Sequence, residues 1–98
     1  MTPSAGDVWC ADRNDERRRL VYIVSDHRFH RLAGRVVIAP VLDASPGPQR
    51  PWYVPIAEGV VAANQFATVP VDRLLERVSR SDLPALQRVR RAVHNIVG

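Results

Sequence analysis

The most apolar stretch of this chain is residues 35–42 (RVVIAPVL), and it places the strictest limit on the fold. A run so rich in β-branched residues, starting directly after Gly34, predicts a central strand of a sheet. Pro40 has no backbone N–H to donate, so this strand needs an edge, a bend or a bulge at that position. No apolar run in the chain approaches the ~18 residues that a membrane span requires, so we expect no membrane segment.

Shorter runs on both sides of this stretch predict further strands. Branched and aromatic residues indicate strands at 8–11, 20–25 and 52–56, and one or two strands within 59–71. Between them we expect a hairpin-like turn at 12–18, a polar connection at 26–33 and, because it holds three prolines, a long irregular loop at 43–51. Residues 72–78 (DRLLERV) are expected to form one or two helical turns, with Asp72 as the N-cap.

The C-terminal segment carries the clearest helical pattern. Ser81 or Asp82 can cap it, Pro84 suits a first turn and Gly98 ends it. Apolar residues recur there at helical spacing and should form one buried face: Leu83, Leu86, Val89, Val93, Ile96 and Val97. Short strands followed by one helix predict a mainly β fold, a small barrel with a helix packed on it. At 98 residues, the chain is expected to form a single domain, 1–98.

Common catalytic and metal-binding motifs are missing from the sequence. It has no phosphate-binding glycine loop, no paired-cysteine zinc spacing and no His-Glu metal helix, so we expect no metal and no cofactor. His27 and His30 could bind a metal only if residues 26–33 were helical, and we interpret both as exposed loop residues. His94 is expected on a helix surface. Cys10 is interpreted as a small core residue, and a single cysteine fits a reducing cytoplasm.

The basic side chains suggest an anionic partner. All 14 are arginines, and the formal net charge is +4. Three of them, Arg17, Arg18 and Arg19, precede one expected strand, while Arg50, Trp52 and Tyr53 lie at the start of another. If these strands are neighbours, guanidinium groups and flat rings share one rim, which suits the phosphates and bases of single-stranded nucleic acid. The alternative is that the arginines are solvated and the two rings belong to the core.

Three motifs resemble those of the MazF/PemK and CcdB toxin superfamily of bacterial toxin–antitoxin systems. Residues 6–9 (GDVW) are similar to the opening "G-[DE]-[IV]-W" of MazF-like toxins. Residues 19–25 (RLVYIVS) lie where those toxins have "R-P-x-[VL]-[VI]-[VL]-[ST]", and residues 59–69 (GVVAANQFATV) resemble their late "D-Q" segment. The closing helix also fits, so the resemblance covers nearly the whole chain.

This resemblance implies a fold and an activity. It implies an SH3-like barrel, a homodimer, inhibition by a cognate antitoxin protein and, for MazF/PemK members, ribosome-independent cleavage of single-stranded RNA at specific sequences. In the family, an arginine at the start of the second strand stabilises charge in the transition state, and Arg19 is its counterpart. Leu42 and Asp43 occupy the place of the usual threonine or serine. Asp43 is therefore our candidate base, and Ser45 is the nearest hydroxyl.

Other departures keep two alternatives open. Asn64 replaces the "D-Q" aspartate and Ala62 the arginine before it. Residues 34–38 and 67–71 look like segments of CcdB, which implies a DNA gyrase poison, although the tryptophan near the CcdB terminus is absent. A third possibility is a catalytically silent homologue that binds RNA or antitoxin. The GDVW opening and the arginine-rich first loop favour the endoribonuclease.

Overall fold

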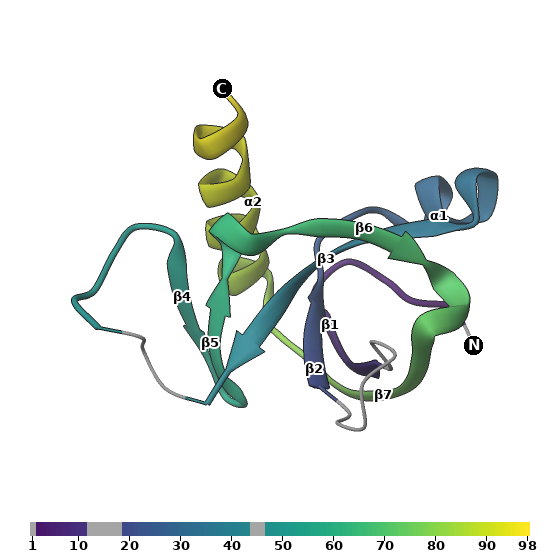
Figure 1. The fold of residues 1–98 in the computed structure, drawn as a ribbon, viewed down its shortest axis with the longest axis horizontal. Coiled ribbons are helices and arrows are strands. Elements are labelled where there is room, and N and C mark those ends of the chain that lie inside the picture. Colours follow the sequence, from purple (N-terminus) through teal and green to yellow (C-terminus); the bar gives the residue numbers. More distant parts are fainter. Residues whose placement is uncertain (1, 12–18, 44–46) are drawn as a thin grey trace.

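Seven strands and two α-helices make up the computed structural model, which describes residues 2–11, 19–43 and 47–98 (Figure 1). Arg17, Arg18, Ser45 and the whole of the expected turn at 12–18 lie outside the described residues. Two short 3₁₀ helices lie at Ala63–Gln65 and Val71–Arg73. The strands are β1 (Asp7–Ala11), β2 (Arg19–Ile23), β3 (Arg35–Leu42), β4 (Tyr53–Ile56), β5 (Gly59–Ala62), β6 (Ala67–Pro70) and β7 (Leu74–Arg80); the helices are α1 (His27–Ala33) and α2 (Leu83–Val97).

Strand β3 is the centre of the sheet, as residues 35–42 predicted. The strand order is β4-β5-β3-β2-β1-β7, and β6 also pairs with β3. Along one edge of β3, residues Arg35 to Ile38 pair with β6, whereas Val41 and Leu42 pair with β5. Pro40 lies between these two partners, where that edge of β3 needs no donor. The irregularity expected at Pro40 is therefore the point where the pairing partner of β3 changes from β6 to β5.

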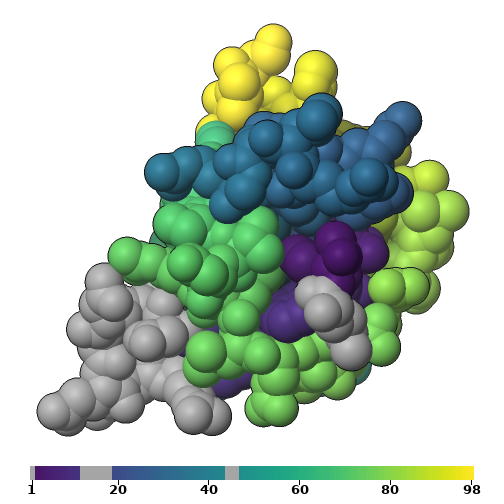
Figure 2. Space-filling view, turned by 90° about the vertical axis from the view of Figure 1, so that its right-hand side faces the viewer, coloured from purple at the N-terminus to yellow at the C-terminus, as the bar shows by residue number. Residues whose placement is uncertain are grey.

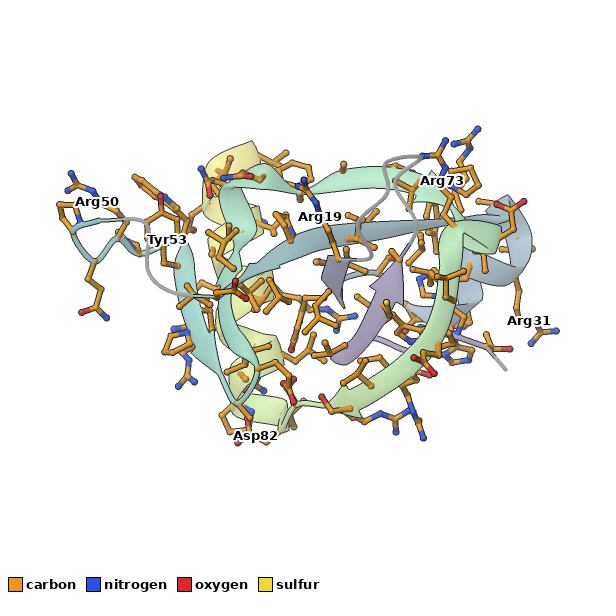
Figure 3. All side chains as sticks on the ribbon, turned by 60° about the horizontal axis from the view of Figure 1, so that its bottom comes forward. Arg19, Arg31, Arg50, Tyr53, Arg73 and Asp82 are labelled. Carbon is orange, nitrogen blue, oxygen red and sulfur yellow. The ribbon has the colours of Figure 1, made fainter. Side chains whose placement is uncertain are left out.

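The predicted fold class, mainly β with a C-terminal helix, is confirmed. The antiparallel sheet curls strongly, as a small SH3-like barrel does (Figure 3), but no strand pairing among the described residues joins its edge strands β4 and β7. Both faces are buried. One face packs against Leu86, Val89 and Ala92 of α2, and the other is covered by the curl of the sheet around Trp9, Val21, Ile23, Val36 and Ile38.

Helix α2 begins and ends where the sequence indicated, but its buried face is narrower. The Asp82 carboxylate accepts a hydrogen bond from the Ala85 amide at 3.0 Å, and Gly98 closes the last turn. Leu83, Ile96 and Val97, expected in the core, are 63%, 43% and 68% exposed. The prediction was wrong for these three because the buried side of the helix runs from Ala85 to Ala92, with Val93 partly buried beside it, and leaves both ends of the helix exposed.

Residues 26–33 were predicted as a polar connection, and this was wrong, because they form helix α1. The Asp26 carboxylate accepts the Arg28 amide at 2.8 Å as an N-cap, which also lowers the pKa of Asp26. Gly34 ends the helix with φ of 66°, a left-handed conformation that glycine adopts without strain. In Figure 2, α1 lies across the upper part of the face, directly over the N-terminal segment.

His30 was expected in an exposed loop, but it is buried in α1, whereas His27 and His94 are exposed as predicted. Its Nδ1 donates to the Pro3 carbonyl at 3.0 Å, and its Nε2 is hydrogen-bonded to the Ser25 hydroxyl at 2.5 Å. That hydroxyl in turn accepts the Val37 amide at 2.9 Å. His30 therefore links Pro3 of the N-terminal segment, through Ser25, to strand β3 of the sheet.

The helical turns predicted at 72–78 were also wrong. Only Val71–Arg73 forms a 3₁₀ turn, with Pro70 rather than Asp72 at its N-cap position, and Leu74–Arg80 is strand β7. This strand pairs with β1 along Asp7–Ala11, with two register shifts. Pairing with an otherwise open sheet edge outweighs the weak helical preference of the sequence.

Candidate functional site

Arg19 lies at the start of the second strand, where the resemblance placed it. It is the first residue of β2, is exposed, and pairs with Ala11 of β1. Strands β2 and β3 pair from Ile23 and Ile38 to Val21 and Pro40, and beyond Pro40 strand β3 pairs with β5. Because β2 and β3 are antiparallel, the start of β2 and the end of β3 lie toward the same end of this strand pair.

Asp43 directly follows the last residue of β3 and is exposed. The topology thus puts a guanidinium and a carboxylate at the same end of two adjacent strands. A guanidinium stabilises negative charge that develops on a phosphate, and a carboxylate accepts a proton. This strand end therefore carries two of the chemical groups that phosphodiester cleavage needs.

A separate groove lies between the β3–β4 connection, strand β4 and helix α2. Its volume is about 870 Å³. The lining residues are Gln49, Arg50, Pro51, Trp52, Tyr53, Val54, Pro55, Arg88, Arg91, Ala92, Asn95 and Ile96. The predicted nucleic-acid residues Arg50, Trp52 and Tyr53 thus line one cavity, and none of the described residues around it is acidic.

The two rings of the groove are half-buried and meet edge to face. The centroids of Trp52 and Tyr53 lie 6.0 Å apart, with an interplanar angle of 70°. The Trp52 indole Nε1 is buried and has no hydrogen-bond partner among the described residues. Such a donor costs free energy until an acceptor reaches it.

The expectation that Arg19 and the rings share one rim depended on neighbouring strands, and these strands are not neighbours. Strands β5 and β3 lie between β4 and β2. Figure 3 shows Arg50 and Tyr53 at one extremity of the molecule and Arg19 near the middle of the sheet. The site is therefore divided into a strand end and a groove.

Sequence reasoning missed the groove residues of α2. Arg88, Arg91 and Asn95 were not among the predicted site residues, although they are spaced three and four residues apart and so lie on one side of the helix. This spacing was the available signal. What the sequence could not show is that the β3–β4 connection stands opposite that side.

The GDVW motif has a structural explanation. Asp7 is fully buried, and its carboxylate accepts hydrogen bonds from the Ser4 amide at 2.9 Å, Trp9 Nε1 at 3.3 Å and Arg80 Nε at 2.8 Å. The aspartate and tryptophan of the motif are therefore hydrogen-bonded to each other, and the bond from Arg80 to Asp7 links β7 to β1. Cys10, which follows Trp9 in β1, is half-buried rather than part of the core as predicted.

Other positions singled out in the sequence lie apart from these groups. Ala62 is buried at the end of β5, and Asn64 is exposed in the 3₁₀ turn that follows. Within residues 2–11, 19–43 and 47–98, no three side chains of His, Cys, Asp or Glu gather as a metal site. No helix in that part of the chain has the length and apolar character needed to cross a bilayer.

Comparison with known proteins identifies the family. A family model described as "PemK-like, MazF-like toxin of type II toxin-antitoxin system" matches residues 4–97. The chain belongs to this toxin family. Among curated proteins, none matches this PemK/MazF-like sequence.

Solved structures share the fold of this PemK/MazF-like toxin. A MazE–MazF complex from Deinococcus radiodurans is 21% identical, with a TM-score of 0.85, covering 100% of this chain and 97% of that one. An endoribonuclease in complex with its cognate antitoxin, from a mycobacterial species, is 20% identical, with a TM-score of 0.84 and coverage of 98% and 95%. The Mycobacterium tuberculosis toxin MazF-mt6 is 17% identical, with a TM-score of 0.77 and coverage of 93% and 95%.

Proposed function

We propose that this PemK/MazF-like toxin is a ribosome-independent endoribonuclease that cleaves single-stranded RNA at specific sequences. The observation that carries the proposal is that Arg19 begins β2 and Asp43 follows β3, so that both lie toward the same end of two adjacent antiparallel strands. Two structures with the same fold are described as endoribonucleases. The family model is of the PemK/MazF type, which supports this reading over a CcdB-like gyrase poison.

In the proposed reaction, Asp43 takes the proton of a ribose 2′-hydroxyl. The 2′-oxygen attacks the adjacent phosphorus, the bond from phosphorus to the 5′-oxygen breaks, that oxygen takes a proton from water, and Asp43 returns its proton to water. The products are a cyclic 2′,3′-phosphate and a 5′-hydroxyl. Arg19 stabilises the added charge on the phosphate oxygens in the transition state.

Binding and partners are part of the proposal. Arg17, Arg18, Arg50, Trp52 and Tyr53 contact RNA, through charge for the first three and ring faces for the other two. The chain acts in the cytoplasm as one toxin domain, 1–98, forms a homodimer and is inhibited by a cognate antitoxin. Structures of the same fold that contain MazE or a cognate antitoxin support the last point.

A cleavage assay with a substitution of Arg19 tests the proposal. Purified protein is incubated with a long single-stranded RNA, and the 5′ ends of the fragments are mapped. We expect discrete cuts, and Arg19→Ala should reduce the cleavage rate by about 10²–10³-fold, the usual loss when a transition-state donor is removed. Arg31→Ala, at the far side of the molecule in Figure 3, is the control and should cut at the wild-type rate.

A parallel incubation with DNA gyrase and supercoiled plasmid separates the alternatives. Trapped gyrase–DNA complexes without RNA cuts would support the CcdB-like poison. Neither RNA cuts nor trapped complexes would leave a silent binding homologue. Cuts that persist at the full rate in Arg19→Ala would show that Arg19 is not the stabilising group.

A further inference from the structure

The groove is strongly basic for its size. Arg50 stands on the β3–β4 connection, and Arg88 and Arg91 stand on α2, while the described lining residues include no Asp or Glu. All three arginines are exposed and line the groove, so their charges are accessible to a ligand there. An anion in the groove would therefore meet guanidinium groups on both walls.

The helix wall offers these groups as a row. From Arg88 through Arg91 to Asn95, the helix rises 1.5 Å per residue, so the row is about 10 Å long. Repeated positive groups along one line suit a polymer with repeated negative charge better than a single small anion. The opposite wall presents the Trp52 and Tyr53 rings and the unsatisfied indole N–H.

We propose that this groove binds the RNA segment that flanks the cleavage site. Arg88 and Arg91 hold backbone phosphates, bases stack on the exposed parts of Trp52 and Tyr53, and a ribose or phosphate oxygen accepts from the indole of Trp52 after a small rotation of the ring. This inference rests on the proposed function, because RNA is its substrate, and it adds helix α2 to the residues that select the substrate.

Two other occupants fit the groove less well. A second copy of the chain, docked by two-fold symmetry through this groove, would bring like-charged arginines toward one another, which costs free energy. An acidic peptide would match the charge, but it needs neither the ring faces nor a row of arginines at helical spacing. Both occupants remain distinguishable by experiment.

The salt dependence of RNA binding measures the contacts of α2. The probe is a single-stranded RNA methylated at its 2′-oxygens, which can bind but has no nucleophile for cleavage. Wild-type protein, Arg88→Ala/Arg91→Ala and the control Arg28→Ala/Arg31→Ala are titrated at several salt concentrations. The two double variants lose the same charge from the same helical spacing, but the control pair lies on α1.

We expect the groove double variant to flatten the plot of log K against log salt by about 1.4, at about 0.7 for each phosphate contact with a single strand. The control pair should leave the slope unchanged. Equal slopes in all three proteins, or equal flattening in both variants, would overturn the inference while leaving cleavage, and so the proposed function, intact. Conversely, a salt slope that flattens in the groove double variant alone, while the wild-type protein does not cleave RNA, would support RNA binding in the groove and refute the proposed endoribonuclease activity.

Tryptophan fluorescence locates the contact. Trp9 is 5% exposed in the core, so RNA entering the groove should change the emission of Trp52 alone. The change should disappear in Trp52→Phe. A response to polyglutamate but not to RNA would show a peptide site, and dissociation of the groove double variant into smaller species in sedimentation would show that a second copy fills the groove. Either result overturns the inference.

Discussion

At the scale of single residues, Asp7 is a fully buried carboxylate that accepts three hydrogen bonds. Replacing it by alanine leaves the Ser4 amide and the Trp9 indole without their acceptor, and each buried donor costs about 1–3 kcal/mol. We expect Asp7→Ala to lower the free energy of unfolding by about 2–4 kcal/mol in urea denaturation.

The matched control removes only the cation of the same cluster. The Arg80 side chain is 54% exposed and the buried Asp7 keeps its two other donors in Arg80→Ala, so this variant should cost less than Asp7→Ala, about 1–2 kcal/mol. Equal losses in the two variants would mean that the ion pair, and not the two neutral donors, accounts for the effect.

The position and burial of a residue could be predicted only where a local motif determines them. Arg19 was placed at its strand end from the sequence, because a resemblance in register carries position along the chain. The burial of Asp7 and His30 was not predicted, because their partners, Arg80 and Pro3, are distant in sequence. A polar residue that looks exposed locally can be buried once a remote donor or acceptor reaches it.

At the scale of elements, Tyr22 connects β2 to the segment before α2 through a 2.5 Å hydrogen bond with Ser81. Burial raises the pKa of Tyr22, and the Ser81 bond opposes this only in part. Between the unfolded value near 10 and the raised folded value, the folded protein holds the extra proton. The free energy of unfolding should therefore fall as pH rises above about 10.

Tyr22→Phe tests this dependence, because it removes the titrating group and about 1 kcal/mol of hydrogen bonding at neutral pH. Urea denaturation at neutral pH and at about pH 11 should show a smaller alkaline loss in Tyr22→Phe than in wild type. Ser81→Ala keeps the phenol and should keep the alkaline loss. An unchanged loss in Tyr22→Phe would assign it to another group.

Elements were predictable where their pattern was strong and local. The β-branched runs that became β2, β3 and β5 and the capped helix α2 needed no knowledge of neighbours. Helix α1 was missed although Asp26 and Gly34 are ordinary start and stop signals, because the segment between them has no apolar period. Strand β7 was missed for the opposite reason, since its helical pattern is overridden by pairing with β1.

At the scale of the molecule, the strand order separates Arg19 from Arg50, Trp52 and Tyr53, which were expected to share one rim. The chain returns from β3 to β4 and β5 on one side of the sheet, and β2 lies on the other, so Arg19 and the groove are not adjacent. Long-range pairing of this kind has no signature in a single sequence. If both sites act on one RNA, the toxin reads its substrate across much of its 34 Å length.

The two parts of the sheet should nevertheless unfold together, because β3 belongs to both. Its Ile38 pairs with β6 and its Leu42 with β5, and one buried cluster joins Val8 of β1 to Val54 of β4. Each part holds one tryptophan, so Trp9→Phe reports on the groove side through Trp52, and Trp52→Phe reports on the central sheet through Trp9.

For a single domain, each variant should give the same urea midpoint by its remaining tryptophan as by far-ultraviolet circular dichroism, after allowance for its own stability change. An earlier fluorescence transition in Trp9→Phe alone would show that β4 and β5 open before the rest. The groove would then be a separately folding unit, and RNA binding there should stabilise it selectively.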